Sequence, residues 1–416
     1  MKEFKGIKAA IFVFAAGLIM AAMALTPSVV FADKKPFTYG TGNLMVVVER
    51  ENKTVLIIDA TDLEVVKRIS LPKIHQPHAP VFSPDGRYYY VMGRNGYYAK
   101  VDLLAQKIVA EQTIGKDSRG SAISMNGKYI FAGNYRPGTA VIMDSKTLKI
   151  LKTFEGPEGI IKGEIKPSRC ASITDIGGVK DLMAIAWKDG GQVWIVDMKT
   201  APEFKVIKKF LGVGDKLHDG FVSEGGRYFM LAAQKSNHMW ILDAYKDVVN
   251  DSTAYQGTIG TDPVPHPGPG ACWGEVCFET NIGKGTVTAF NPSTMEHLKN
   301  IPTSAAGNPK AAGGLFIRKH PGAPHVVADA VIEGQKTHAY VYVIDVETLE
   351  VVKKIKVGKS AVHPEFSARG AYLFVSSWGE DKVVVYDGLT YKKVKEIPSK
   401  TPTSVINSNR GSEQGL

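Results

Sequence analysis

A short apolar strand that ends in Asp, or once in Asn, recurs eight times along this chain at near-even spacing. Around each one, a polar turn such as SPDGR or SMNGK precedes a strand rich in aromatic and β-branched residues, and a further strand follows. Period-two alternation with Gly, Asn and Asp in the turns predicts antiparallel hairpins rather than helices. We therefore predict an all-β fold, an eight-bladed β-propeller of four-stranded antiparallel blades. The recurring residues are Asp59, Asp102, Asp144, Asp197, Asp243, Asn291, Asp345 and Asp387.

The repeats predict the domain boundaries. We expect an N-terminal extension at 33–43, the propeller at 44–406 and a flexible tail at 407–416. The first unit, 44–70, lacks the polar turn that opens the other units, so we expect it to pair with the segment at 395–406. Such pairing of the chain ends closes the ring and covers strand edges that would otherwise be exposed.

Residues 1–32 have the pattern of an export signal. Three lysines among the first eight residues precede an apolar run, and the segment closes with a small residue, Ala32. The mature chain is then expected in the periplasm, with no membrane span once the signal is cleaved. An uncleaved signal anchor is the alternative, although the apolar run is short for a full span.

Cysteine usage and charge exclude several classes of protein. Three cysteines are too few for a disulfide framework, and whether Cys272 and Cys277 form a local disulfide is left open. The absence of any C-x-x-C or C-x-x-C-H motif excludes a covalently attached c-type haem and a thioredoxin-like centre within this sequence. The net charge of +10 suits anionic ligands, but the basic residues are scattered and predict no nucleic-acid surface.

Basic side chains recur in phase with the repeat. His78, Arg119 and His218 each lie eight positions before the Gly of a Gly-Arg or Gly-Lys turn, and His363 fits within one position. In a propeller this position starts the strand that lines the central channel. The corresponding places in two other blades hold Arg169 and His266, the latter in the Pro- and Gly-rich segment PVPHPGPGACW.

This set of residues indicates a ligand that needs both imidazoles and guanidiniums. Imidazoles suit a transition metal, and arginines suit carboxylates. A metal macrocycle with several carboxylates requires both, whereas a bare metal ion would leave the two arginines unexplained. The simplest alternative is that each His only bonds backbone in its own loop.

At these residues the sequence resembles the haem d1 domain family, which includes cytochrome cd1 nitrite reductase and the propeller proteins of haem d1 biosynthesis. The matching segments include HAPVFSPDGRYYYVMGR, GNYRPGTAVIMD, LHDGF and PHPGPGACW, and the resemblance covers nearly the whole mature chain. It implies haem d1 or its tetrapyrrole precursor as cofactor, bound through its iron to His78. His218 and His266 would then be the distal, catalytic histidines, and Arg119, Arg169 and His363 would contact the cofactor.

Three functions follow as hypotheses. The first is a periplasmic haem d1-binding protein, of oxidoreductase type, in haem d1 biosynthesis or maturation for dissimilatory nitrite reductase. Its expected partners are a periplasmic cytochrome c, cytochrome cd1 nitrite reductase or other maturation proteins. The second is a stand-alone haem d1 nitrite reductase that makes nitric oxide with an external cytochrome c donor. The third is a propeller scaffold that binds proteins and no cofactor.

Overall fold

The computed structural model describes residues 41–246, 248–250, 256–303, 313–334 and 338–412. The predicted signal at 1–32 and most of the predicted extension lie outside these ranges. Within them, no helix combines the length and the apolar character needed to cross a membrane.

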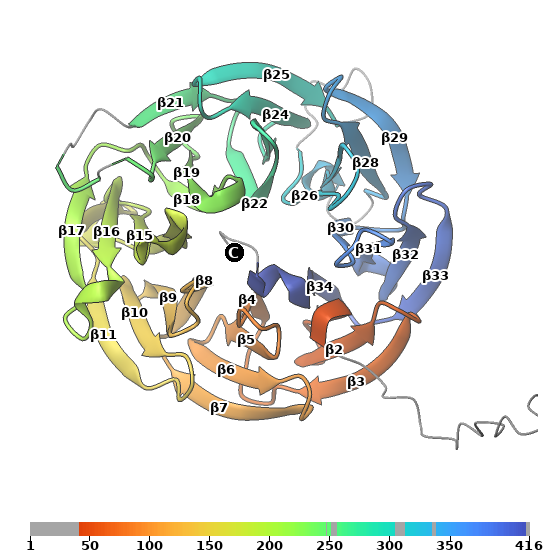
Figure 1. Cartoon of the computed structure of the whole chain (residues 1–416), viewed down its shortest axis with the longest axis horizontal. Helices are drawn as coiled ribbons and strands as arrows, with labels where there is room; N and C mark the ends of the chain where they lie inside the picture. Colours follow the sequence, from red (N-terminus) through yellow and green to blue (C-terminus); the bar gives the residue numbers. More distant parts are fainter. Residues whose placement is uncertain (1–40, 247, 251–255, 304–312, 335–337, 413–416) are drawn as a thin grey trace, which may run out of the picture. The chain divides into compact units, whose positions relative to one another are not determined.

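The predicted eight-bladed β-propeller is confirmed (Figure 1): eight four-stranded antiparallel sheets surround a central channel. The innermost strands contact one another around the channel. They are β34 (Pro402–Asn407), β4 (Pro77–Phe82), β8 (Asp117–Ile123), β14 (Cys170–Ile176), β18 (Leu217–Val222), β22 (Pro265–Trp273), β26 (Ile317–Lys319) and β30 (Ala361–Phe366). The second strands are β1 (Leu44–Glu49), β5 (Tyr88–Gly93), β9 (Tyr129–Arg136), β15 (Leu182–Trp187), β19 (Tyr228–Ala233), β23 (Val276–Asn281), β27 (His325–Asp329) and β31 (Tyr372–Ser377).

The outer half of each blade completes the sheet. The third strands are β2 (Thr54–Asp59), β6 (Tyr97–Asp102), β10 (Thr139–Asp144), β16 (Gln192–Asp197), β20 (His238–Asp243), β24 (Thr286–Asn291), β28 (Tyr340–Asp345) and β32 (Lys382–Asp387). The fourth strands are β3 (Glu64–Ser70), β7 (Lys107–Thr113), β11 (Ile150–Glu155), β17 (Lys205–Phe210), β21 (Gln256–Gly260), β25 (Glu296–Pro302), β29 (Glu350–Lys356) and β33 (Lys393–Pro398). Short 3-10 helices are η1 (Thr41–Asn43), η2 (Gly178–Lys180), η3 (Met198–Thr200), η4 (Glu224–Gly226), η5 (Val331–Gly334), η6 (Trp378–Glu380) and η7 (Ser408–Ser412).

The two ends of the described chain meet in one blade. Strand β34 pairs with β1, so the last strand of the sequence becomes the innermost strand of the first blade. Residues 408–412, within the segment that the sequence assigns to a flexible tail, form η7 beside the channel (Figure 1). Its first residue, Ser408, is buried and accepts a hydrogen bond from the Leu44 N–H at 3.1 Å.

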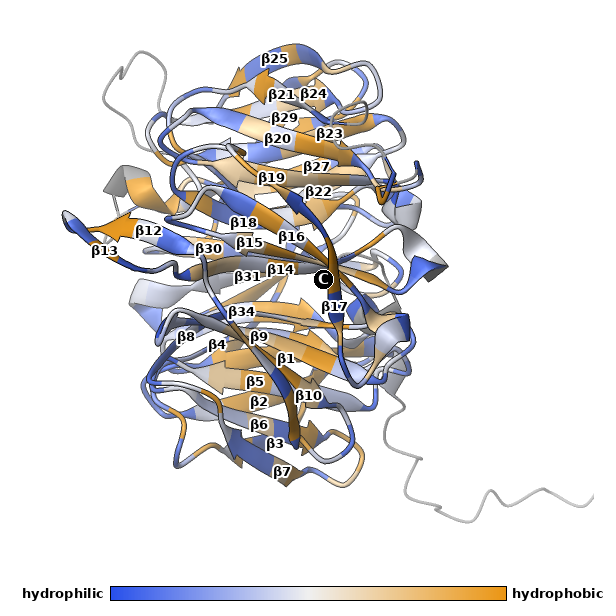
Figure 2. Ribbon diagram, turned by 90° about the vertical axis from the view of Figure 1, so that its left-hand side faces the viewer, coloured by the Kyte–Doolittle hydropathy of each residue, from blue (hydrophilic) through white to orange (hydrophobic). Residues whose placement is uncertain are grey.

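The core lies between neighbouring blades. Because the second and third strands are covered on both faces, their apolar residues are buried in continuous runs. Between the blades of β9 and β15, for example, Phe131 and Ile142 pack in one cluster with Met183, Ile185 and Trp194. Strands near the outer edge are more polar, as the hydropathy colouring in Figure 2 shows for β3 and β7.

The Asp and Asn residues that mark the repeat close the third strand of every blade. Their side chains accept backbone N–H groups of the following turn, as Asp102 does from Leu104 and Ala105 at 3.0 and 2.9 Å. Asn291 does the same for Ser293 at 2.8 Å. These contacts are Asx turns, which explains why only Asp or Asn recurs at this position.

Two local features fall outside the regular blades. The hairpin of β12 (Glu158–Ile161) and β13 (Glu164–Pro167) projects from the body of the propeller (Figure 2). Cys272 and Cys277, whose pairing the sequence left open, are joined by a disulfide across neighbouring strands.

A buried carboxyl, Asp175, lies near the C-terminal end of the inner strand β14. Burial raises its pKa to about 7, even though the Met125 N–H bonds to one of its oxygens at 2.8 Å. Between about pH 4 and 7 the folded chain therefore keeps a proton that the unfolded chain releases.

We expect the Asp175→Asn variant to gain stability relative to the parent as the pH rises through this window. The parent loses up to about 1.4 kcal/mol of unfolding free energy per pH unit through Asp175, whereas the asparagine does not titrate. Urea unfolding of both proteins at several pH values measures the difference. A difference that stays constant with pH would show that Asp175 titrates normally.

Candidate functional site

The start of each inner strand is shaped by an irregularity in strand pairing. In β4 the register shifts between His78 and Val81, and in β18 it shifts between Leu217 and Gly220. Similar shifts follow His266 in β22 and Val362 in β30. An extra unpaired residue redirects side chains that would otherwise follow the strict alternation of a strand.

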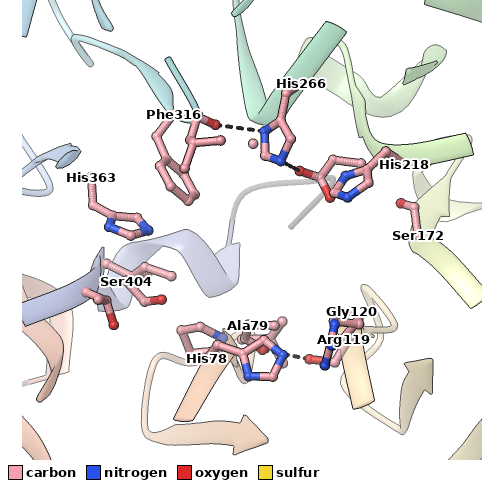
Figure 3. A pocket seen from close by; sticks show the side chains of 18 of the residues that line it. His78, Ala79, Arg119, Gly120, Ser172, His218, His266, Phe316, His363 and Ser404 are labelled. Atoms are coloured by element: carbon pink, nitrogen blue, oxygen red, sulfur yellow. Dashed lines mark hydrogen bonds and ion pairs between the residues drawn. The ribbon is translucent and has the colours of Figure 1, made fainter. Parts of the chain in front are cut away.

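These irregular segments surround a cavity of about 650 Å³ in the channel. Figure 3 shows side chains from all around the ring directed into it, and each blade supplies at least one. In ring order the residues are Ser404, His78, Arg119, Ser172, His218, His266, Phe316 and His363. Five of the six residues predicted to form the site therefore line one cavity, and Arg169 is not among the lining residues.

His78 presents a neutral imidazole with one uncommitted nitrogen. Its Nδ1 lies 3.0 Å from the backbone oxygen of Gln76, so this nitrogen carries the proton and donates. Its Nε2 is buried and has no hydrogen-bond partner within the described part of the chain. Burial, followed by the charge of Arg94, lowers the pKa of His78 to about 3. A buried nitrogen lone pair of this kind suits a metal ligand.

Across the cavity from His78, two imidazoles flank one carboxylate (Figure 3). His218 Nδ1 lies 3.0 Å from one oxygen of Asp219, in an ion-pair contact that lacks the alignment of a hydrogen bond. His266 Nε2 lies 3.4 Å from the other oxygen, and the two imidazole rings are 4.8 Å apart. Burial opposes ionisation of Asp219, but both histidines and Lys188 outweigh it and hold the pKa of the carboxyl well below its usual range.

This three-residue group has the donor atoms for holding a proton or a cation. The possible ligand atoms of His218, Asp219 and His266 lie within 4.8 Å of one another. Burial is the largest effect on His218 and lowers its pKa, whereas the Asp219 carboxylate acts in the opposite direction. The group can therefore accept a proton at one imidazole while the carboxylate stabilises the resulting charge.

His363 faces the same space beside an aromatic ring that the sequence did not predict as a site residue. Its ring stacks against Phe316 with 3.7 Å between the ring centroids, and its Nδ1 is buried without a hydrogen-bond partner in the described ranges. Burial, and then Arg318 and Arg50, lower its pKa well below the usual value. The sequence offers one indication that Phe316 belongs to the site. It stands at the start of the inner strand, just before β26, where each of the other blades has a polar residue.

The two predicted arginines are already engaged within the protein. Arg119 pairs with Asp117 and lies over the Tyr135 ring, with 4.7 Å between the guanidinium carbon and the ring centroid. Arg169 bonds to both oxygens of Asp189, at 2.8 and 2.7 Å. Because Nε and Nη2 of Arg169 are both committed to Asp189, this guanidinium has less capacity to bind a further carboxylate than Arg119, which is engaged through Nη1.

Four further residues of the cavity, which the sequence did not predict, lie just after the second strands of their blades. Arg50, Arg94, Lys188 and Trp378 come directly after β1, β5, β15 and β31, and all four line the cavity. Antiparallel pairing places the end of a second strand beside the start of the inner strand, which explains their position. The Nε atoms of Arg50 and Arg94 are buried without a hydrogen-bond partner among the described residues. Burial, and then Arg119, lower the pKa of both guanidiniums.

Two more guanidiniums are held by a buried acid at the edge of the cavity. Arg318 Nε and Arg410 Nη2 lie 3.0 and 2.8 Å from oxygens of Glu365, and both arginines line the cavity. Arg410 comes from η7, so the C-terminal segment contributes to the site. Burial opposes the charge of Glu365, but the two arginines lower its pKa.

The charge of the cavity favours an anionic ligand. Among the described lining residues, Asp219 is the one acidic side chain. The cationic lining residues are Arg50, Arg94, Arg119, Lys188, Arg318 and Arg410. Burial, the largest effect, lowers the pKa of Lys188 to about 8. Arg119, Arg318 and Arg410 have internal carboxylate partners, whereas no ion pair with a described residue is found for Arg50 or Arg94. Half-buried positive charges of this kind are costly, so a ligand with several carboxylates would relieve them.

Comparison with known proteins gives consistent matches over the whole propeller. The model of the family described as "Cytochrome D1 heme domain" matches residues 39–411. Protein NirF of Pseudomonas aeruginosa is 28% identical over 391 residues, covering 92% of this chain and 96% of that protein. Dihydro-heme d1 dehydrogenase of the same organism is 30% identical, covering 88% and 71% of the two chains. Nitrite reductase of Stutzerimonas stutzeri is 28% identical, covering 88% and 70%.

A solved structure has the same fold. The dihydro-heme d1 dehydrogenase NirN in complex with DHE superposes with a TM-score of 0.77 at 28% identity, covering 91% of this chain and 78% of that one. A functionally unknown protein from Desulfotomaculum acetoxidans has a TM-score of 0.56 at 12% identity, which indicates a shared fold alone.

Proposed function

Because this chain belongs to the cytochrome D1 heme domain family, we propose that it binds haem d1, or the dihydro precursor of haem d1, in the central cavity and acts in haem d1 biosynthesis. Two of the relatives support this role: Protein NirF and a dihydro-heme d1 dehydrogenase. The observation that carries the proposal is the buried, unpartnered Nε2 of His78 at the wall of a cavity of about 650 Å³.

The residues present fit such a group. His78 would hold the iron through Nε2, because its Nδ1 proton is already donated to Gln76. Arg50 and Arg94 would bind carboxylates of the macrocycle, and the family resemblance adds Arg119 and Arg169. The aromatic ring of Phe316, stacked on His363, offers an apolar surface for a flat ligand. When bound, a haem d1-type group supplies a redox-active iron.

On the side opposite His78, this chain's own residues can handle protons. His218 and His266 would face the open side of the cofactor as the catalytic pair, with Asp219 orienting both rings and stabilising a protonated imidazole. Such a group can remove a proton from a precursor side chain or deliver one to a small bound anion. The first task belongs to maturation and the second to nitrite reduction.

The cellular setting is part of the proposal. The predicted signal at 1–32 would place the mature protein in the periplasm, where a cytochrome c, cytochrome cd1 nitrite reductase or other maturation proteins could exchange electrons or cofactor with it. A stand-alone nitrite reductase remains the second candidate, favoured by the distal pair His218 and His266 and by the likeness to a nitrite reductase.

Adding haem d1 to the purified protein is expected to give saturable binding at one equivalent, with a change in the visible absorption of the cofactor. An unchanged spectrum would instead favour a scaffold that binds no cofactor. Binding alone does not separate maturation from nitrite reduction, so a second experiment is needed.

The loaded protein, reduced with excess donor and given nitrite, is expected to make no sustained nitric oxide. Sustained production that is lost in the His218→Ala and His266→Ala variants would overturn the maturation role and establish the reductase. His297→Ala, an exposed position on β25, is the matched control.

A further inference from the structure

Asp329 is a buried carboxylate behind the cavity wall that organises three of its side chains. It ends β27, has no exposed surface and is not a lining residue. Its Oδ1 accepts the N–H groups of Leu315 and Phe316 at 2.7 and 3.4 Å, and its Oδ2 accepts that of His363 at 3.2 Å. One side chain thus joins the starts of two neighbouring inner strands, β26 and β30.

The contacts of these residues extend the influence of Asp329 to a third blade. The backbone oxygen of Leu315 lies 3.1 Å from Nδ1 of His266, so that nitrogen donates, and this bond turns Nε2 toward Asp219. Phe316 stacks on His363 and also lies 6.4 Å from the His266 ring. The rings of His266, Phe316 and His363 therefore depend on backbone that Asp329 holds.

Local structure explains why an acid is needed there. Strand β26 begins only at Ile317, and the pairing of β30 is irregular at His363, so the amides of all three residues lack a strand partner. Unpaired buried N–H groups are costly, and a carboxylate has enough lone pairs to accept all of them. Gly314 fits this packing, because a Cβ there would lie 2.1 Å from the Asp329 backbone oxygen.

We propose that Asp329 is a positioning residue for the distal side of the cavity, setting the orientation of the His266 ring and the contact of Phe316 with His363. The ligand-binding consequence rests on the proposed function, whereas the structural consequence does not. Burial raises the pKa of Asp329 to about 7, although the backbone N–H groups that it accepts act in the opposite direction.

The first test uses the ligand-free parent protein. Hydrogen exchange followed by NMR is expected to show slow exchange for the amides of Leu315, Phe316 and His363, although none lies in a regular strand pair. Nitrogen shifts of the His266 ring are expected to show that Nδ1 carries a proton. Unprotected amides, or an Nδ1 without a proton, would overturn the proposal without any variant.

The second test compares Asp329→Asn with a matched control, Asp175→Asn. An asparagine has one acceptor oxygen, so it cannot accept both the N–H groups of Leu315 and Phe316 and that of His363. Hydrogen exchange of the amides that lose their acceptor is expected to rise about tenfold. Binding of haem d1 is expected to weaken about tenfold in the same variant. Asp175 is also a buried acid with a pKa near 7, but it bonds to Met125 and lies outside the cavity lining.

Each outcome decides one question. Equal weakening of haem d1 binding in both variants would show that Asp329 acts only through general stability and would overturn its positioning role. Restoration of slow exchange and of the Nδ1 proton of His266 in Asp329→Glu would support it. If the parent fails to bind haem d1, the proposed function fails, while the His266 and exchange results still decide the role of Asp329.

Discussion

Replacing His78 by alanine is expected to raise the Kd for haem d1 at least about 100-fold, because loss of a metal ligand should cost no less than loss of the groups that support one. The variant removes the one cavity imidazole whose Nδ1 is fixed by Gln76 and whose buried Nε2 is uncommitted. The absorption spectrum of any cofactor that still binds should shift, because the iron would lose the nitrogen ligand that His78 is proposed to supply. Titration of the purified protein with haem d1 measures both effects.

The His78 prediction has two controls. His297→Ala removes an exposed imidazole that hydrogen-bonds to Asn300 outside the cavity, and it should bind haem d1 as the parent does. Free imidazole added to His78→Ala should restore part of the parent spectrum by occupying the vacated space. Unchanged affinity and spectrum in His78→Ala would mean that another residue, or none, ligates the iron.

Most of the fold could be predicted because its determinants are local and repeated. The Asp or Asn at the end of each third strand caps the next turn through its own side chain, so the same residue type was needed eight times. Closure by β34 could also be foreseen, since the first unit lacked one strand. The 3-10 helix η7 could not, because its order depends on distant contacts such as the Arg410 pair with Glu365.

The candidate site was only partly predictable, for a geometric reason. A phase relation finds residues at one position of the repeat, and it brought His78, Arg119, His218, His266 and His363 to the same cavity. It also selected Arg169, which occupies an equivalent position but is held by Asp189. The pairing partner of a side chain cannot be deduced from its phase in the repeat.

The same limit hid Arg50 and Arg94, for which the described part of the chain offers no ion pair. Arg50 and Arg94 stand after second strands, where VVVER and YYYVMGR end in arginine, and antiparallel pairing returns these ends to the cavity face. The residue directly after the second strand is thus a second position at which basic side chains recur in phase with the repeat, although fewer repeats have one there. Half-buried guanidiniums whose Nε atoms have no hydrogen-bond partner among the described residues are then the property that points to an anionic ligand.

Removing these two cations is expected to weaken haem d1 binding strongly. Arg50→Gln and Arg94→Gln should each raise the Kd about tenfold, since a hydrogen bond to a charged group contributes about 1.5–3 kcal/mol. If the two guanidiniums hold different carboxylates, the double variant should lose about 100-fold, because independent effects add. Titrations of the three variants at low and high salt measure these losses.

Arg169→Gln is the decisive comparison, because it separates phase in the repeat from availability for a ligand. Its guanidinium already satisfies Asp189, and Lys216 also reaches that carboxylate at 2.6 Å, so its loss should leave the Kd for haem d1 nearly unchanged. Esterified haem d1 sharpens the test: without carboxylates, it should bind the parent, Arg50→Gln and Arg94→Gln with the same affinity. A larger loss of affinity in Arg169→Gln than in Arg50→Gln or Arg94→Gln would mean that Arg169 binds the carboxylates, as its phase in the repeat predicts. The reverse order would mean that Arg50 and Arg94, for which no ion pair with a described residue is found, bind them.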